Sequence, residues 1–379
     1  MNKVLITATV ASMIDLFNMD NIKILQNMGY QVDVAANFKE GNVTSDRRIE
    51  EFKNELESLN VGIYHIGFTR KAFAIGKHLG AYRKLVNICK DNNYDFIHTQ
   101  TPIAGALTRL VANNLDIKVV YMAHGFHFYD GAPKLNWFIY YPVEKYLSKV
   151  TNTLITINNE DFERSKSFNA QRNIYVPGVG VDLDIDRLSC SEVSRKKEEL
   201  DVHGDNIFVS VGELNDNKNH RIVIEAFSKI ENNDYLYLIV GKGPNHEELQ
   251  DLIEEKNLTK NIRLIGYRSD ILEILQISNV FIFPSFREGL SKSLMEAMAV
   301  GLPAIVSNIR GNTDLIDDKL GGYLFEPDDV SSLKEKIVNI INDNEKKVDF
   351  SRYNINKIKL FSIENVNNEM ERIYSYLKK

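Results

Sequence analysis

The sequence predicts an α/β protein built from two doubly wound parallel sheets. Short apolar, β-branched runs alternate with longer segments of helical periodicity, and this alternation starts twice along the chain. The length of 379 residues exceeds what one ordinary hydrophobic core supports and suits two domains. We therefore expect two Rossmann-like domains facing each other across a cleft, where ligands of such folds bind.

Strands of the first domain are expected in six apolar runs, each followed by a helical segment such as 14–28, 75–92 or 102–114. These runs are VLITAT (4–9), QVDVAA (31–36), VGIYHI (61–66), YDFIHT (94–99), KVVYMA (118–123) and TLITIN (153–158). The second domain repeats the pattern in NIFVSVG (206–212), YLYLIVG (235–241), NIRLIGY (261–267), NVFIFPS (279–285) and PAIVSN (303–308). Because strands that alternate with helices are joined by crossovers, both sheets should be parallel.

The boundary between the domains is expected near YVPGVGVDLD (175–184), which has Pro177, Gly178 and Gly180 and no helical period. We place the N-terminal domain at 1–181 and the C-terminal domain at 182–361. A final helix is expected within 362–379.

Composition excludes several classes of protein. Residues 1–181 hold 20 Lys and Arg against 17 Asp and Glu, and the remainder holds 26 against 35. An acidic C-terminal half argues against a nucleic-acid partner. Cys89 and Cys190 form neither a disulfide framework nor a zinc set. No stretch approaches the roughly 20 apolar residues that span a bilayer, and the N-terminal run reads as a strand rather than a signal peptide.

The most informative stretch is PSFREGLSKSLMEAMAVGLPAIVS (284–307), a buried strand end followed by a loop and a helix that starts near Ser291. Amides at the start of that helix should bind a diphosphate; they belong to Gly289, Leu290, Ser291 and Lys292. Glu288 can reach a hydroxylated group beside the phosphates, and Glu296 can accept bonds from a ribose diol. The spacing alone is equally compatible with a loop charge at 288 and an exposed side chain at 296.

The EGLSKSLMEAMAVGLP context, with seven residues between Glu288 and Glu296, resembles the paired-glutamate motif of retaining GT-B glycosyltransferases of family 4. The resemblance extends over nearly the whole chain, and it implies that the final helix within 362–379 packs back on the N-terminal domain. It implies a GT-B fold in which Glu288 contacts the donor sugar, Glu296 binds the ribose, and the loop amides hold the diphosphate.

The segment VGELNDNKNH (211–220) resembles the family's donor-binding segment, beginning with Gly212, in which an Arg and a Lys clamp the diphosphate. Lys218 stands at the Lys position, and the alternative for it is a solvated side chain. Glu213 stands where the family has Arg and cannot donate to phosphate. Arg268 and Arg287 are possible substitutes.

Two further segments complete the resemblance in this domain. VGKGP (240–244) has a Gly-x-Gly but no third glycine at dinucleotide spacing, so we interpret it as a turn lining the nucleotide pocket. GYRSDI (266–271) resembles the loop whose backbone reads the base, which favours a uridine donor.

In the N-terminal domain, His124 in AHGFHFYDG resembles the family's active-site histidine, which approaches the donor sugar from the opposite domain. The alternative is a histidine buried at the strand end and bonded to backbone. His127 and Ser12 are candidates for acceptor binding. Ser12 lies in TATVASMID (7–15), interpreted as a loop in the place where many family members have a glycine-rich turn.

Two segments raise the question of a membrane. The aromatic residues between 126 and 141 are dense, and we interpret most as core and some as acceptor-site or interfacial side chains. Residues 68–90 read as a basic amphipathic helix with its lead-in. Most such stripes face a core, so contact with anionic lipid is a hypothesis.

The resemblance implies a retaining transfer of a sugar, with an N-acetylated hexosamine on UDP as first choice, to a sugar on undecaprenyl diphosphate in capsular or exopolysaccharide assembly. We expect no metal and no cofactor, and a cytoplasmic protein that is peripheral on the inner face of the cell membrane. The alternatives are a UDP-sugar 2-epimerase and a nonenzymatic sugar-nucleotide-binding scaffold. An NAD-dependent dehydrogenase is disfavoured because no GxGxxG follows a strand.

Overall fold

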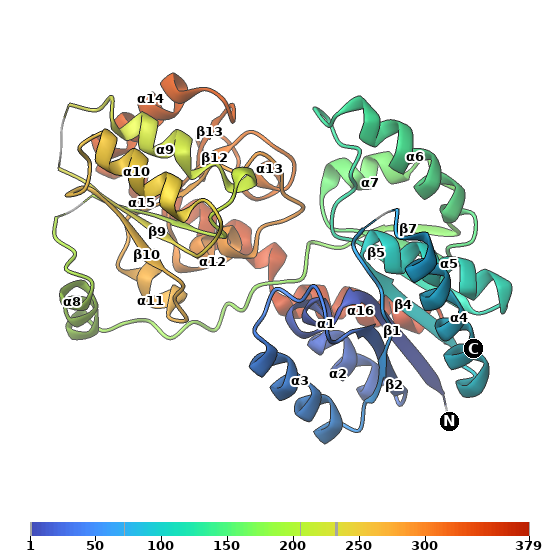
Figure 1. Cartoon of the computed structure of the whole chain (residues 1–379). Helices are drawn as coiled ribbons and strands as arrows, with labels where there is room; N and C mark the ends of the chain where they lie inside the picture. Colours follow the sequence, from blue (N-terminus) through green and yellow to red (C-terminus); the bar gives the residue numbers. More distant parts are fainter. Residues whose placement is uncertain (1, 72, 205, 232–233, 379) are drawn as a thin grey trace. The chain divides into compact units, whose positions relative to one another are not determined.

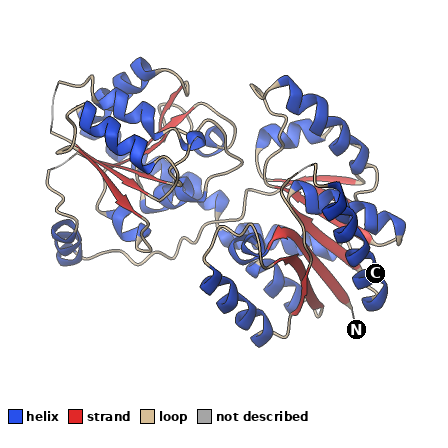
Figure 2. Ribbon diagram, viewed as in Figure 1, coloured by secondary structure: helices blue, strands red, loops and turns tan. Residues whose placement is uncertain are grey.

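The computed structural model describes residues 2–71, 73–204, 206–231 and 234–378. The chain divides into two compact units (Figure 1). Unit 1 comprises Met1–Val179 with Glu364–Lys379, and unit 2 comprises Gly180–Ile363. Each unit has one parallel sheet with helices on both faces, coloured red and blue in Figure 2.

The strands of unit 1 are all parallel and form a seven-stranded sheet in the order β3-β2-β1-β4-β5-β6-β7. They are β1 (Lys3–Val10), β2 (Gln31–Asn37), β3 (Gly62–His65), β4 (Phe96–Gln100), β5 (Lys118–Ala123), β6 (Thr153–Thr156) and β7 (Arg172–Tyr175). The helices are α1 (Ala11–Phe17), α2 (Met19–Asn27), α3 (Asp46–Ser58), α4 (Ile75–Asn92), α5 (Pro102–Asn114), α6 (Lys134–Ser148), α7 (Asn159–Ser165) and α16 (Ile363–Ser375).

Unit 2 has a six-stranded parallel sheet in the order β10-β9-β8-β11-β12-β13. Its strands are β8 (Ile207–Val211), β9 (Leu236–Val240), β10 (Ile262–Gly266), β11 (Val280–Phe283), β12 (Ala304–Ser307) and β13 (Gly322–Phe325). Its α-helices are α8 (Cys190–Glu199), α9 (His220–Phe227), α10 (His246–Glu255), α11 (Ile271–Gln276), α12 (Lys292–Val300), α13 (Asn312–Leu315), α14 (Val330–Ile341) and α15 (Asn344–Lys357). Two 3₁₀ turns, η1 (Asp216–Lys218) and η2 (Ile358–Phe361), complete it.

The predicted fold class is confirmed, and every predicted strand coincides with a strand of the structure. β7 and β13 were not anticipated, because each has four residues and neither carries a long apolar run. The loop expected at 7–15 is wrong: β1 continues to Val10 and α1 begins at once. The segment contains no glycine to make a turn, and Ala11 and Met13 favour a helix.

The order of the strands decides which helices share a face of the first sheet. The chain runs from β1 out to β3, crosses back to β4, and then runs out to β7. Because crossovers between parallel strands are right-handed, α4, α5 and α6 cover one face and α1 to α3 the other. α16 joins this second face (Figure 1), where Tyr374 stacks on Phe96 with 5.7 Å between ring centroids.

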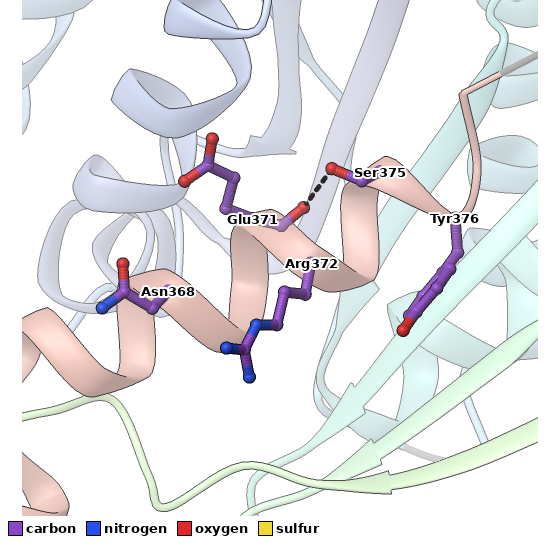
Figure 3. Close-up of a pocket in the computed structure, with 5 residues that line it drawn as sticks. All are labelled: Asn368, Glu371, Arg372, Ser375 and Tyr376. Carbon is purple, nitrogen blue, oxygen red and sulfur yellow. Dashed lines mark hydrogen bonds between the residues drawn. The ribbon is translucent and has the colours of Figure 1, made fainter.

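The last helix is tied to the centre of the first sheet by a buried hydrogen bond. The hydroxyl of Tyr374 lies 2.7 Å from Nδ1 of His98 on β4, and both side chains are buried. The opposite side of α16 and the turn after it line a pocket with Asn368, Glu371, Arg372, Ser375 and Tyr376 (Figure 3). That pocket contains none of the residues that the sequence assigns to the site.

Replacing Tyr374 tests the anchoring of α16. Tyr374→Phe keeps the ring and leaves Nδ1 of His98 buried without its partner, so we expect unfolding free energy to fall by about 1–3 kcal/mol. Tyr376→Phe, in the turn directly after α16, is the control: its ring is exposed and packs on Arg172, which Phe preserves. Urea unfolding of both variants measures the difference. Equal stabilities would contradict an anchoring role for the bond.

Candidate functional site

The loop between β11 and α12 in unit 2 is the part of the structure that the sequence singles out. α12 begins at Lys292, and the Ser291 side chain caps it by accepting a hydrogen bond from the Leu294 amide at 3.3 Å. A helix leaves its first amides without intrahelical acceptors. This helix start, with Gly289 and Leu290 in the loop leading to it, therefore offers donors and a positive dipole end to an anion.

Two predicted site residues, 70 positions apart, meet beside this helix start. Nζ of Lys218 donates to Oε1 of Glu288 at 2.7 Å, and the side chains are only 18% and 14% exposed. Lys218 also lies over the ring of Phe283, 4.4 Å from its centroid. The structure thus holds a largely desolvated cation and carboxylate next to the amides of the helix start. The interpretation of Lys218 as a solvated lysine is wrong.

The turn that carries Lys218 is fixed to the 284–287 loop by several bonds. Asn215 caps the turn by accepting the Lys218 amide at 3.1 Å. The backbone of Asn217 accepts the Phe286 amide at 2.8 Å, and its side chain donates to the Arg287 carbonyl at 3.0 Å. Because these bonds hold the two backbone segments together, the fold itself keeps Lys218 and Glu288 close to each other.

Glu296 lies one turn into α12 and is partly buried, so the alternative of an exposed side chain is wrong. Burial raises the pKa of its carboxyl, and Lys292, whose Nζ is 3.8 Å away, lowers it. A carboxylate partly withdrawn from water gains from hydrogen-bond donors. A vicinal diol supplies two such donors.

Arg310 is a residue of this site that the sequence analysis missed. It is 8% exposed, and its Nε donates to the carbonyl of Glu288 at 3.1 Å. The neighbouring Gly311 has φ +79°, and a Cβ there would lie 2.3 Å from the Gly289 carbonyl oxygen. The signal was available: Arg310 is the one cation in SNIRGN (307–312), directly after a strand that pairs with β11.

The two arginines proposed as substitutes for the missing clamp residue stand apart from this arrangement. Arg268 is bonded to Asp270 at 2.8 Å and Glu199 at 2.6 Å, so two carboxylates neutralise it. Arg287 has an exposed side chain. Glu213 is also exposed and accepts from the Asn215 side chain at 2.9 Å.

The glycines after β8 and β9 bring two loops together. Gly241 has φ +155°, and a Cβ on it would lie 1.8 Å from the Gly212 carbonyl oxygen. A side chain on Gly212 would meet Cε of Lys218 at 3.1 Å. The Gly-x-Gly at 240–244 therefore serves close approach of backbones beside Lys218, which accounts for it without a dinucleotide.

In unit 1, His124 is held by a chain of amide side chains. Its Nε2 lies 2.6 Å from Oε1 of Gln100, and Nε2 of Gln100 donates to Oδ1 of Asn18 at 2.5 Å. Since the Gln100 nitrogen is committed to Asn18, the Gln100 oxygen accepts from His124, and Nδ1 is the nitrogen left to accept. Burial lowers the pKa of His124 to about 4, so the ring is neutral at pH 7.

The two acceptor candidates lie near helices of the same unit. Ser12 is buried in α1, and its hydroxyl accepts the Val43 amide at 3.2 Å. The ring of His127 packs on that of Tyr140 with 4.6 Å between centroids. Phe126 and Phe128 are buried, so the core interpretation is confirmed for them. Phe138 is exposed instead.

The described residues contain neither a membrane-spanning helix nor a cluster of metal-ligating side chains. No helix among them is long and apolar enough to cross a bilayer. No group of three or more His, Cys, Asp or Glu side chains among them could hold a metal ion.

Comparison with family models gives two matches that together span most of the chain. Residues 192–357 match the model described as glycosyl transferases group 1. Residues 20–185 match the model described as glycosyltransferase family 4.

Individual relatives and a solved structure also resemble this chain. The chain is 34% identical to the putative glycosyltransferase EpsD of Bacillus subtilis over 344 residues, 88% of this chain and 86% of that one. It is 33% identical to UDP-Gal:alpha-D-GlcNAc-diphosphoundecaprenol alpha-1,3-galactosyltransferase of Escherichia coli, covering 70% and 71% of the two chains. The structure of HepE from Anabaena in complex with UDP and glucose superposes with a TM-score of 0.79 at 18% identity, covering 99% and 100%.

The buried histidines predict how stability depends on pH. Burial lowers the pKa of His124 to about 4 and that of His220 to about 3, against about 6.5 when unfolded. Below pH 6.5 the unfolded chain therefore binds protons that the folded chain does not. We expect unfolding free energy to fall as pH drops from about 6.5 to 4, by up to roughly 1.4 kcal/mol per pH unit for each such histidine.

A pair of variants isolates one of these groups. Among the described residues neither ring nitrogen of His220 has a hydrogen-bond partner, so His220→Leu should reduce the acid slope without loss of a bond. His203→Leu is the control, because His203 is exposed. Urea unfolding between pH 4.5 and 7 compares the slopes. An unchanged slope in His220→Leu would contradict the assignment.

Proposed function

Because the chain belongs to glycosyltransferase family 4 and is a glycosyltransferase of GT-B fold, we propose that it transfers a sugar from a UDP-sugar to a saccharide linked to a lipid diphosphate. The anomeric configuration is retained. The product belongs to capsular or exopolysaccharide biosynthesis. The observation that carries the proposal is the Lys218–Glu288 pair beside the first turn of α12.

A nucleoside diphosphate fits the chemistry of this place. The helix start and Lys218 supply positive potential and donors for the two phosphates, with Gly212 making room for the Lys218 stem. Glu296 accepts from the ribose diol. Glu288 accepts from hydroxyls of the donor sugar, and Arg310 keeps its backbone in place. Arg268 has a secondary role at most, because its charge is already paired.

The same groups support the chemical step. The bond between the anomeric carbon and the phosphate oxygen breaks, and the acceptor oxygen attacks from the same face. The acceptor proton passes to the leaving phosphate oxygen, so Glu288 anchors the sugar and is not the base. Lys218 and the helix amides carry the countercharge as it develops, which is why we propose a reaction without metal or cofactor.

His124 assists from unit 1 as a neutral ring. Its Nδ1 accepts from a hydroxyl of the donor sugar, while Gln100 holds the proton on Nε2. His127 is proposed to contact the acceptor, and the buried Ser12 is proposed to act on acceptor binding through the 42–43 loop, whose Val43 amide its hydroxyl accepts.

The names of similar proteins support the choice of substrates. The Escherichia coli relative is named for UDP-Gal and a diphosphoundecaprenol-linked sugar, and the HepE complex contains UDP and glucose. We propose an N-acetylated hexosamine as donor sugar, with galactose tested beside it. An acceptor in the bilayer and a donor in the cytoplasm place the protein peripherally on the inner face of the cell membrane, with contact through residues 68–90.

A turnover assay tests the proposal. The protein is incubated with UDP-N-acetylhexosamines or UDP-galactose and a short-chain lipid-diphosphate sugar. New glycolipid supports the transferase. A changed nucleotide sugar without glycolipid means a UDP-sugar 2-epimerase. UDP binding without turnover means a nonenzymatic scaffold. The scaffold is worth testing because Glu213 stands where the family has an arginine that binds the diphosphate.

Substitutions locate the reaction at the proposed site. Lys218→Met removes the buried cation, and we expect kcat/KM to fall by about 100-fold or more. Glu296→Gln should weaken UDP binding by about tenfold or more, since a bond from a diol to a charged acceptor is lost. Lys260→Met, an exposed lysine of the same unit, is the control. Wild-type turnover after alanine replaces both Glu288 and Glu296 would contradict the proposal.

A further inference from the structure

α6 carries two apolar faces on opposite sides of the helix. One face packs inward through Trp137, Tyr140 and Tyr141 onto a buried cluster, and Leu147 is buried on the same side. The other face is exposed and follows the helical period: Leu135, Phe138, Ile139, Val143 and Tyr146. Phe138 is 84% exposed, Leu135 67% and Tyr146 64%.

The exposed face cannot turn inward, because the inner face is anchored. Glu144 of α6 is buried and pairs with Arg109 of α5 at 2.8 Å. The Arg109 guanidinium stacks on the Tyr121 ring of β5 at 3.9 Å, and the Tyr121 hydroxyl donates to Glu144 at 3.3 Å. The outer face is therefore a permanent apolar surface of the fold.

α4 extends this surface. α5 contacts both α4 and α6, and all three helices cover the same face of the sheet. At helix packing distances of 8–10 Å, α4 lies about 20 Å from α6. Its start exposes Phe73, Ile75 and Leu79, while Leu85 and Ile88 further along are buried. The basic segment 68–90 is thus exposed at its lead-in and first turns; residue 72 lies outside the described residues.

The exposed apolar residues at the starts of α4 and α6 lie at the same edge of the sheet. In a parallel sheet every crossover helix begins where the preceding strand ends. Ile75 follows β3 and Leu135 follows β5, so both lie toward the carboxyl edge. His124, directly after β5, lies at this edge too.

The charge around this surface is predominantly positive. Over α4, α5 and α6, whose residues are all described, the exposed ionisable groups are one carboxylate, Asp91, and six cations: Lys77, Arg83, Lys84, Lys90, Lys134 and Lys145. Lys134 and Lys145 follow the helical period along one flank of the apolar face of α6. Lys77 has an exposed partner in Glu40 at 3.6 Å, which is a weak pair in water.

We propose that the outer face of α6, together with the start of α4, inserts into an anionic lipid surface. Rings and aliphatic side chains enter the interface, and the flanking lysines and arginines meet lipid phosphates. The lipid contact itself does not depend on the proposed function. Its biological purpose rests on that function, because a membrane-bound protein would meet a lipid-linked acceptor at the sheet edge that carries His124. The sequence analysis had raised both 68–90 and some of the aromatic residues between 126 and 141 as membrane contacts; α6 carries the larger exposed apolar part.

Co-sedimentation of the full chain with vesicles tests the proposal. We expect binding to vesicles that contain phosphatidylglycerol, weaker binding to phosphatidylcholine alone, and release by salt. The double variant Phe138→Ser with Tyr146→Ser should lower the partition coefficient about tenfold or more. Val348→Ser with Leu360→Ser removes comparably exposed apolar side chains from unit 2 and should bind like the wild type.

Trp137 supplies a readout specific to α6. It is the single tryptophan of the chain and neighbours Phe138 on α6. Lipids with brominated chains should quench its fluorescence in the wild type and the control and leave the α6 variant unquenched. Because the α6 positions are exposed, urea unfolding should show both variants folded.

The outcomes separate this proposal from the proposed function. Unchanged vesicle binding by the α6 variant would overturn the insertion, as would wild-type protein that ignores vesicles and forms dimers the variant abolishes. Turnover with a water-soluble acceptor should be the same in wild type and α6 variant. Absent turnover with intact vesicle binding would count against the transferase proposal and leave the membrane surface standing.

Discussion

Everything functional in this chain depends on the parallel pairing of both sheets. Parallel strands end at one edge, and each is followed there by a turn into a crossover helix. In unit 2 the turns after β8, β9, β11 and β12 consequently bring Lys218, Gly241, Glu288 and Arg310 to one place. In unit 1 the same constraint gathers Asn18, Gln100 and His124. Residues distant in sequence become neighbours because the hydrogen-bonding pattern of the backbone leaves no alternative.

The ion pair of Lys218 and Glu288 shows how such a place is stabilised before a ligand arrives. A cation and a carboxylate that are each more than four-fifths buried need each other, since burial of either alone is costly. In the proposed reaction an incoming polyanion would offer the cation a new partner, and sugar hydroxyls would offer one to the carboxylate. Both charged side chains would therefore keep a partner when the ligand replaces their ion pair. The bonds from Asn217 to the 284–287 loop would hold Lys218 and Glu288 in the same relative position.

Hydrophobic periodicity predicted most strands, and the motif resemblance predicted most of the candidate site. The elements and contacts that the sequence did not predict were missed for physical reasons. Long apolar β-branched runs identified the inner strands, whereas β7 and β13 have four residues each and gave too little pattern. Lys218 and Glu288 were placed in one site by resemblance, but their direct contact needed coordinates. Arg310 was missed although its position directly after β12 was visible in the sequence, because its bond to the Glu288 carbonyl appears only in the structure. Phe138 was grouped with aromatic residues assigned mostly to the core, because one helix with two apolar faces resembles a core helix until its neighbours are known.

The bond between Tyr374 and His98 spans 276 positions and links α16 to β4 within one unit. A ribosome releases β4 well before α16, with all of unit 2 emerging between them. While unit 2 is being synthesised, the face of the N-terminal sheet that α16 covers therefore remains exposed to solvent. Such a nascent chain is a natural client for chaperones, and a stop codon before position 374 would damage the part of the protein that was made first.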